Sequence, residues 1–406
     1  MLTPEYLYRI TEEAEDIASQ LHKNIIDKII ARMMARIGRG EDYLLTATDK
    51  WQIEVLQDAG YLLADIQQEL SDKTKRQVKE IKEAMEEAGV TALQWDDKIY
   101  QAAGLSPVPL LQSPALTRIM QRNYEATAGE WRNFTRTTAN EAQRLFINQM
   151  DNAYNMVVSG AVSYTEAVRD VINNVSEVGM KVSYPSGYKL SIESATMMIV
   201  RTGISQAAAE VSLERMKEMD WDIILVSSHL GARIGDGGQN PENHSWWQGK
   251  FYSRTGKDKR FPDFVSTTGY GSITGLSGVN CRHSFGSGDG ENNPFEQYDT
   301  EENRKVYEKQ QKQRTLERRV RDTKRKLQNM QTAIDNCRDE KLKFELQQDF
   351  DRKSYLLKKQ NAAYKQYCEY NNLKPYAERL KTAKWDREQA MKAAGAARRY
   401  QNAKGE

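Results

Sequence analysis

The chain has 406 residues, a length that suggests two to four domains. Hydrophobic residues make up 39% and charged residues 29% of the chain, and the mean hydropathy is −0.76, so long solvated helices are favoured over a large buried sheet. Its 25 glycines and nine prolines are too few for a collagen-like or wholly disordered chain. No window offers about 18 uninterrupted apolar residues, so we expect no membrane span.

The charge is distributed unevenly along the chain. The net charge is +2, but residues 301–406 hold 28 basic and 16 acidic residues, a net charge of +12, whereas residues 1–300 hold 31 basic and 41 acidic residues, a net charge of −10. We therefore expect an acidic body and a basic C-terminal part suited to a polyanion or an acidic protein surface. Three cysteines and the lack of a basic start followed by an apolar run predict a reducing compartment and no secretory signal.

The first 220 residues show the periodicity of helices. Apolar residues spaced by three and four predict one long helix over 3–37, with Thr3 as its cap, and a second helix over about 48–88 that stops at Gly89. After a linker at 104–109, helices are predicted over 114–158, 164–176 and 191–219, and residues 182–188 have the chemistry of a hairpin. We divide this part into helical regions at 1–104 and 105–220.

The character of the chain changes near Trp221. Residues 231–290 contain 13 of the 25 glycines, and the β-branched run at 223–226 predicts a strand. Residues 221–300 are thus expected to form a small glycine-rich α/β module.

Helical periodicity returns after residue 300. A heptad seam of about three repeats runs from Leu316 to Cys337, and a second apolar set predicts a returning or continuing helix. We expect basic coiled-coil-like helices over 301–372 and a basic, partly disordered tail over 373–406. The predicted fold class is mainly α, with a long helical N-terminal region, the small module and a C-terminal helical segment.

The module contains side chains that bind zinc well. They are His229, His244, Cys281 and His283. Their spacing matches no common zinc pattern, so the alternative is a set of side chains that hydrogen-bond a glycine-rich loop fold. We expect no cofactor, and zinc at these four residues is the alternative.

Two further patterns in the sequence could contact a partner. Trp246 and Trp247 could stack nucleobases, but paired tryptophans in a small module more often form its core. A basic helix near 313–326 could be the solvated face of a coiled coil or could contact DNA phosphates independently of sequence. The residues that would make this contact are Arg314, Arg318, Arg319, Arg321, Lys324 and Arg325.

A hydrolase or nuclease would need a base and a nucleophile. His244 or His283 could act as the base beside Asp236, Glu242 or Asp289, but no G-x-S-x-G elbow is present. Since nothing selects one base–nucleophile pair, we expect no enzyme, and a metal-dependent hydrolase or nuclease built on residues 229–283 is one alternative.

Several motifs in this order resemble a known family. They are the stretches at 184–187, 191–193 and 200–202, the set His229, Arg233, His244, Trp247, Gly249, Asn280, Cys281, Arg282 and His283, and the basic pattern over 307–325. Over about 180–370 the chain resembles the minor capsid proteins of tailed bacteriophages of the phage minor capsid protein 2 type, relatives of the Mu F-like head morphogenesis proteins. One departure is an insertion at 234–243, which lengthens the loop before His244.

The resemblance implies a structural protein of the virion head, assembled in the host cytoplasm and located near the portal vertex. It implies a Mu F-like module at 221–300, the portal protein and other capsid proteins as partners, and a role in head assembly, DNA packaging or ejection. Packaged DNA, bound without sequence specificity by the basic helices, is an alternative partner and function.

Overall fold

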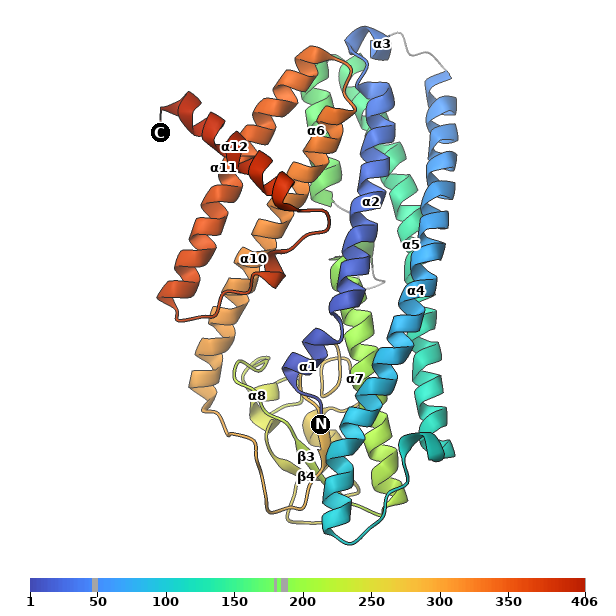
Figure 1. Ribbon diagram of the computed structural model, residues 1–406, viewed down its shortest axis with the longest axis vertical. Coiled ribbons are helices and arrows are strands. Elements are labelled where there is room, and N and C mark those ends of the chain that lie inside the picture. Colours follow the sequence, from blue (N-terminus) through green and yellow to red (C-terminus); the bar gives the residue numbers. More distant parts are fainter. Residues whose placement is uncertain (46–49, 179–180, 184–188, 406) are drawn as a thin grey trace. The chain divides into compact units, whose positions relative to one another are not determined.

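The computed structural model describes residues 1–45, 50–178, 181–183 and 189–405. The fold is mainly α, as predicted, with long helices and short strands (Figure 1). The chain forms two compact units, each built from three separate stretches. Unit 1 comprises Met1–Glu15, Thr74–Asn133 and Ser194–Gln311, and unit 2 comprises Asp16–Lys73, Phe134–Glu193 and Lys312–Glu406. The five consecutive domains expected from the sequence were defined by the composition of each segment, not by contacts between segments. They therefore stay a prediction.

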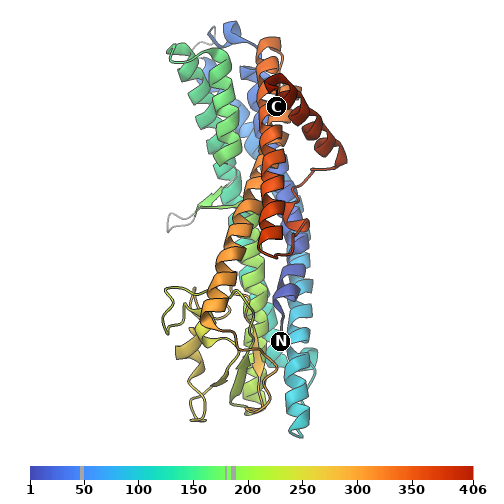
Figure 2. The same cartoon turned by 90° about the vertical axis from the view of Figure 1, so that its left-hand side faces the viewer.

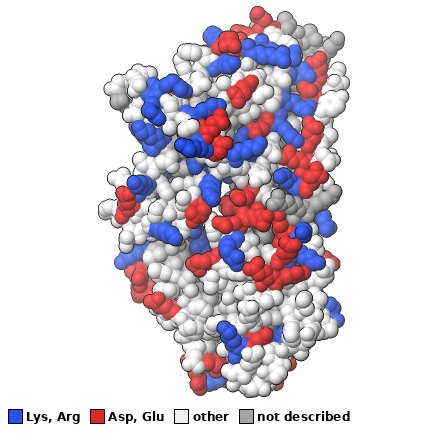
Figure 3. Space-filling model, viewed as in Figure 1, with Lys and Arg blue, Asp and Glu red and all other residues white. Residues whose placement is uncertain are grey.

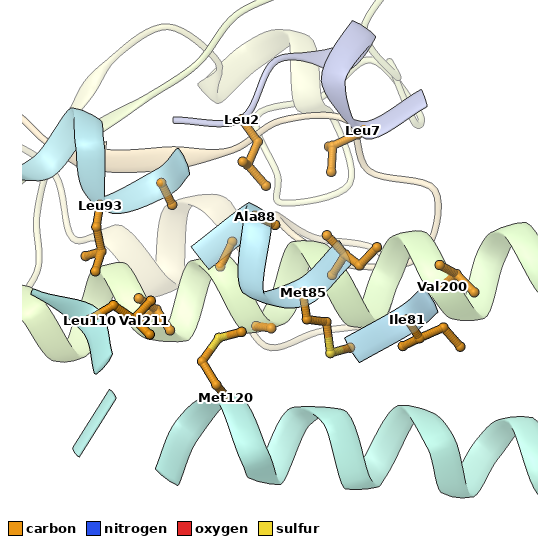
Figure 4. Packing of buried hydrophobic residues seen from close by; sticks show 14 of the residues in the cluster. Leu2, Leu7, Ile81, Met85, Ala88, Leu93, Leu110, Met120, Val200 and Val211 are labelled. Atoms are coloured by element: carbon orange, nitrogen blue, oxygen red, sulfur yellow. The ribbon is translucent and has the colours of Figure 1, made fainter. Parts of the chain in front are cut away.

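The helical part of unit 1 is built on an apolar core. It contains α1 (Pro4–Arg9), α7 (Ile192–Glu218) and parts of two longer helices, α4 (Lys50–Ala102) and α5 (Pro114–Val158). Figure 4 shows Met85 of α4, Met120 of α5 and Val211 of α7 in one buried cluster. Helix α7 approaches α5 closely at Gly203, where an added Cβ would lie 2.4 Å from the Thr127 hydroxyl oxygen.

The helices near the N-terminus differ from the prediction in two places. The expected single helix over 3–37 is two helices, α1 and α2 (Glu12–Ile37), because the Thr11 side chain donates back to the carbonyl of Tyr8 at 2.9 Å and the helix breaks there. The expected stop at Gly89 is also wrong, since α4 runs on to Ala102. A Cβ at Gly89 would lie 3.1 Å from the Leu110 side chain, so the glycine provides packing space within the helix.

The glycine-rich module of unit 1 contains a three-stranded antiparallel sheet in the order β4-β3-β5. The predicted strand is confirmed as β3 (Ile223–Val226), and it pairs with β4 (Phe251–Ser253) and β5 (Phe285–Ser287). Two short helices, α8 (His244–Trp247) and α9 (Phe264–Thr268), complete the module.

Unit 2 contains most of α2 together with α3 (Glu41–Leu45), α6 (Tyr164–Val178), most of α10 (Thr300–Asp335), α11 (Glu340–Tyr370) and α12 (Arg387–Lys404). It also holds the antiparallel pair β1 (Lys181–Ser183) and β2 (Lys189–Ser191). The predicted hairpin chemistry at 182–188 is thus partly confirmed, and residues 184–188, which include the motif at 184–187, lie outside the described residues.

The predicted seam of α10 is buried in unit 2. Val320, Leu327 and Ile334 are buried, and the apolar set of α11 is buried as well. Helix α11 returns antiparallel to α10, because Gln313 near the start of this stretch contacts Cys368 near the end of α11.

The partly disordered tail expected over 373–406 contains a helix, α12 (Arg387–Lys404). Asp386 caps the N-terminus of α12, where its carboxylate accepts a hydrogen bond from the Gln389 amide at 2.9 Å. It lies against α11 in both views (Figures 1 and 2), where Arg399 forms two hydrogen bonds with Asp351. The alanine-rich sequence predicts a partly disordered tail, but alanines of α12 are buried, and this packing stabilises the helix.

Among the described residues, no helix is long and apolar enough to cross a membrane.

Candidate metal centre

The sheet of unit 1 positions the expected metal-binding side chains. His244 is the first residue of α8, and Cys281 and His283 lie in the stretch that leads into β5. Ile224 of β3 and Phe285 of β5 are buried in the core of the module, so β3 and β5 hold this stretch in place.

Three of the four expected side chains converge. The Cys281 Sγ atom lies 3.7 Å from the Nδ1 atom of His244 and 3.7 Å from the Nδ1 atom of His283. The three ligand atoms all lie within 4.8 Å of one another. The residues are buried, with exposed fractions of 1%, 3% and 0% for His244, Cys281 and His283.

The other nitrogen of each imidazole faces a carbonyl-type oxygen. His244 Nε2 lies 2.8 Å from the backbone oxygen of Thr274, and His283 Nε2 lies 2.9 Å from Gln248 Oε1. Burial lowers the pKa of His244 to about 4 and that of His283 well below its usual value. Burial also raises the pKa of the Cys281 thiol to about 11. At neutral pH, without a bound cation, both imidazoles are therefore neutral and the thiol is protonated.

His229 does not join this group. Its ring stacks on the His283 ring, with centroids 4.4 Å apart and an interplanar angle of 23°. Its Nδ1 atom lies 3.3 Å from the Leu230 carbonyl oxygen. The group of converging ligand atoms does not include His229, whose ring packs against the cluster.

Arg233 and Trp247 form the walls around the cluster. Arg233 donates hydrogen bonds to the carbonyl oxygens of Thr274 at 3.2 Å and Val279 at 2.7 Å. The Trp247 ring is buried, donates to the Pro241 carbonyl at 2.9 Å, and lies 4.5 and 4.9 Å from the two histidine rings of the cluster. The core role expected for this tryptophan is therefore confirmed.

The remaining residues of the predicted motif shape the backbone. Gly249 has φ +64°, and an added Cβ would lie 2.6 Å from the Gln297 side chain, so a glycine is needed there. Asn280 also adopts a left-handed conformation, with φ +59°, directly before Cys281. Arg282 lies between Cys281 and His283 in the chain and is half-buried.

Sequence reasoning missed three polar residues that hold the site. Gln248 and Thr274 supply the oxygens that face the two imidazoles. The buried Asn303 accepts hydrogen bonds from the amides of Gly231 and Ala232 at 2.8 and 2.9 Å. A buried asparagine 72 residues after Gly231 leaves no local pattern in the sequence. Gln248, next to Trp247, was recognisable only as a polar residue in an aromatic stretch.

The basic side chains predicted to bind DNA are used differently along α10. Arg321 and Lys324 donate to the backbone oxygens of Arg379 and Leu380, and Arg325 pairs with the buried Glu193 at 2.9 Å. These three residues hold unit 2 together. Arg318 and Arg319 are exposed and Arg314 is half-buried, so a DNA contact through them stays a prediction.

The comparisons with known proteins give one family. The family model of phage minor capsid protein 2 matches residues 2–369. No curated protein and no solved structure matches the chain.

Proposed function

Because the chain belongs to the phage minor capsid protein 2 family, it is a structural component of the virion with other virion proteins as partners, and we propose that it lies near the portal vertex. There it takes part in head assembly, DNA packaging or ejection, after assembly in the host cytoplasm. The single observation that carries this function is the family match over residues 2–369. We expect no enzymatic activity, because the matching family is one of capsid proteins.

Exposed apolar side chains on α4 support a protein partner. Ile53, Leu56 and Tyr61 are 59%, 58% and 66% exposed, and they lie within two turns and a half of one helix. Large apolar side chains that gather on an exposed face are typical of protein interfaces. We expect this part of α4 to contact the portal protein.

The first experiment is quantitative mass spectrometry of purified particles, before and after release of DNA. A low copy number that stays with the emptied shell supports the proposal, whereas loss with the DNA indicates an ejected protein. Absence from particles would overturn the role in the head. The variant Ile53→Glu/Leu56→Glu should reduce incorporation, and the control Gln52→Glu/Gln57→Glu, on exposed polar positions of the same helix, should not.

DNA contact is a second candidate function, favoured by a basic cleft between α11 and α12. The cleft has a volume of about 460 Å³ and is lined by Arg352, Lys353, Tyr355, Leu356, Lys359, Tyr400 and Lys404. None of these lining residues is acidic. Figure 3 shows Lys and Arg side chains over α11 and α12, with Asp and Glu side chains among them, and the lysines and arginine of the cleft itself could attract phosphates.

Aromatic rings lie among these cations. The rings of Tyr355 and Tyr400 lie 5.5 Å apart, and the ammonium groups of Lys359 and Lys404 lie 4.6 and 5.5 Å from the centroids of these two rings. A positively charged groove with aromatic rings can hold a nucleic-acid backbone without reading its sequence. The alternative is a solvated basic face that binds no DNA.

Fluorescence anisotropy with labelled DNA at several salt concentrations separates these cases. Removing three cations in Arg352→Gln/Lys359→Gln/Lys404→Gln should reduce the slope of log K against log salt by roughly 2–3, since each phosphate contact contributes about 0.9. The matched variant Arg314→Gln/Arg318→Gln/Arg319→Gln on α10 should leave the slope unchanged. The opposite result would assign the contact to α10, and no change in either variant would exclude both surfaces.

A further inference from the structure

Two buried imidazoles direct the same kind of atom at one sulfur. His244 Nε2 faces the backbone oxygen of Thr274, which can only accept, so this nitrogen carries the proton. A neutral imidazole has one proton, and the Nδ1 atom of His244, 3.7 Å from Cys281 Sγ, is therefore a lone pair.

The same assignment holds for His283. Gln248 Oε1 accepts a hydrogen bond from the backbone amide of His229 at 3.0 Å, which identifies this atom as the amide oxygen. His283 Nε2 donates to the same oxygen at 2.9 Å. The Nδ1 atom of His283, 3.7 Å from Cys281 Sγ, is thus a second lone pair aimed at the sulfur.

A thiol cannot satisfy both lone pairs. Cys281 offers one weak S–H donor, so one imidazole nitrogen would stay without a partner in a buried site. A buried polar atom without a partner costs about 1–3 kcal/mol. A cation between the three atoms would satisfy both nitrogens and the thiolate together.

The distances fit zinc. With Zn–S near 2.3 Å and Zn–N near 2.0–2.1 Å, tetrahedral geometry separates sulfur from nitrogen by about 3.5 Å. The two measured separations are 3.7 Å. The oxygens of Thr274 and Gln248 also match the usual surroundings of a metal centre, where the other imidazole nitrogen donates to a carbonyl or carboxylate oxygen.

We propose that His244 Nδ1, Cys281 Sγ and His283 Nδ1 bind a zinc ion. The ion joins the start of α8 to the stretch that enters β5, two segments that come from distant parts of the module. Within the described part of the chain, no fourth His, Cys, Asp or Glu belongs to the group, so the fourth position is left to a non-protein ligand such as water. His229 is not a ligand.

The test measures metal in the full chain, purified without metal-affinity chromatography. Elemental analysis should find one zinc per chain, and the Cys281→Ser and His283→Gln variants should lose it. The matched control Cys368→Ser replaces another buried cysteine outside the cluster and should retain the metal, as should His229→Gln. Retention in His229→Gln distinguishes the three-ligand site from a four-ligand site.

Cobalt substitution gives a readout that does not depend on a variant. The wild-type chain loaded with Co²⁺ should show a thiolate-to-cobalt charge-transfer band and the intense visible bands of a tetrahedral site. A folded wild-type chain that binds neither zinc nor cobalt stoichiometrically would overturn the proposal. A Cys281→Ser variant that keeps its zinc would also overturn the proposal. Incorporation of the protein into particles is a separate measurement, which tests the proposed function and not the zinc site.

Discussion

Replacing Arg325 by methionine should destabilise unit 2 strongly. Arg325 of α10 and His22 of α2 both contact Glu193 Oε1, at 2.9 and 2.8 Å. The side chains of Glu193, His22 and Arg325 are only 5%, 10% and 20% exposed. Burial alone would raise the pKa of Glu193, but the charges of Arg325 and His22 and the hydrogen bond from His22 hold it well below its usual value.

The expected loss follows from the burial of the pair. Removing one partner of a buried ion pair costs about 3–5 kcal/mol when the other charge is left without compensation. Because His22 still contacts Glu193 in the variant, we expect the lower end of this range, about 3 kcal/mol. For a unit of this size, about 1 kcal/mol shifts the melting temperature by roughly 2–4 °C, so we expect a decrease of about 6–12 °C. Calorimetry, with hydrogen exchange to locate the change in α2 and α10, measures this effect. The control Arg318→Met, at an exposed position of α10, should change the free energy of unfolding by less than about 0.5 kcal/mol.

The stability that the Glu193 ion pair contributes should decrease as the pH is lowered. The folded-state pKa of Glu193 is lowered, so its contribution is present above the unfolded pKa of about 4.3 and is lost as the pH falls through the folded pKa. The advantage of the wild type over Glu193→Gln should therefore shrink below about pH 4.3. Additive effects of Glu193→Gln and Arg325→Met in a double-mutant cycle would refute the reasoning, since contacting charges should couple.

Three further substitutions test the packing, each by thermal or denaturant unfolding. Trp247→Ala should cost about 3–5 kcal/mol, because the ring is fully buried in the glycine-rich module; a loss under 1 kcal/mol would contradict its core role. Gly203→Ala should cost about 1–3 kcal/mol, since the new Cβ would meet the Thr127 hydroxyl oxygen, and a second change, Thr127→Ala, which removes that hydroxyl, should recover part of the loss if the contact is the cause. Tyr164→Phe should cost about 1–3 kcal/mol, because the hydroxyl donates to the Ile37 carbonyl at 2.6 Å at the end of α2; unchanged stability would show that water replaces this bond.

Local pattern was sufficient for the type and position of most elements. The helix at Pro114–Val158, the strand at Ile223–Val226 and the seam of α10 follow from the spacing of apolar residues, which depends only on backbone periodicity. Local pattern failed where a distant residue decides the outcome. Gly89 does not end helix α4; it leaves space for the side chains of Leu110 and Met120, which pack beside it. Because these two residues come later in the chain, the local sequence could not reveal this role.

The sequence identified the four side chains of the metal hypothesis, but it could not choose among them. The oxygens of Thr274 and Gln248 fix which nitrogen of each imidazole carries the proton, and so direct two lone pairs at the Cys281 thiol. Nothing in the sequence around Thr274 or Gln248 indicates this role. The position of His229 outside the group of converging ligand atoms is decided by the tertiary structure.

The charge of the C-terminal part was likewise readable from composition, but the use of each charge was not. Arg325 neutralises a buried carboxylate supplied by a segment 132 residues earlier in the chain. Lys359 and Lys404 line one cleft only because α12 packs on α11. Composition and periodicity determined that this is a mainly helical protein with a glycine-rich module and a basic C-terminal part. Tertiary structure alone decided which polar groups meet, because the energy of a buried charge or lone pair depends on neighbours that are close in space and distant in sequence.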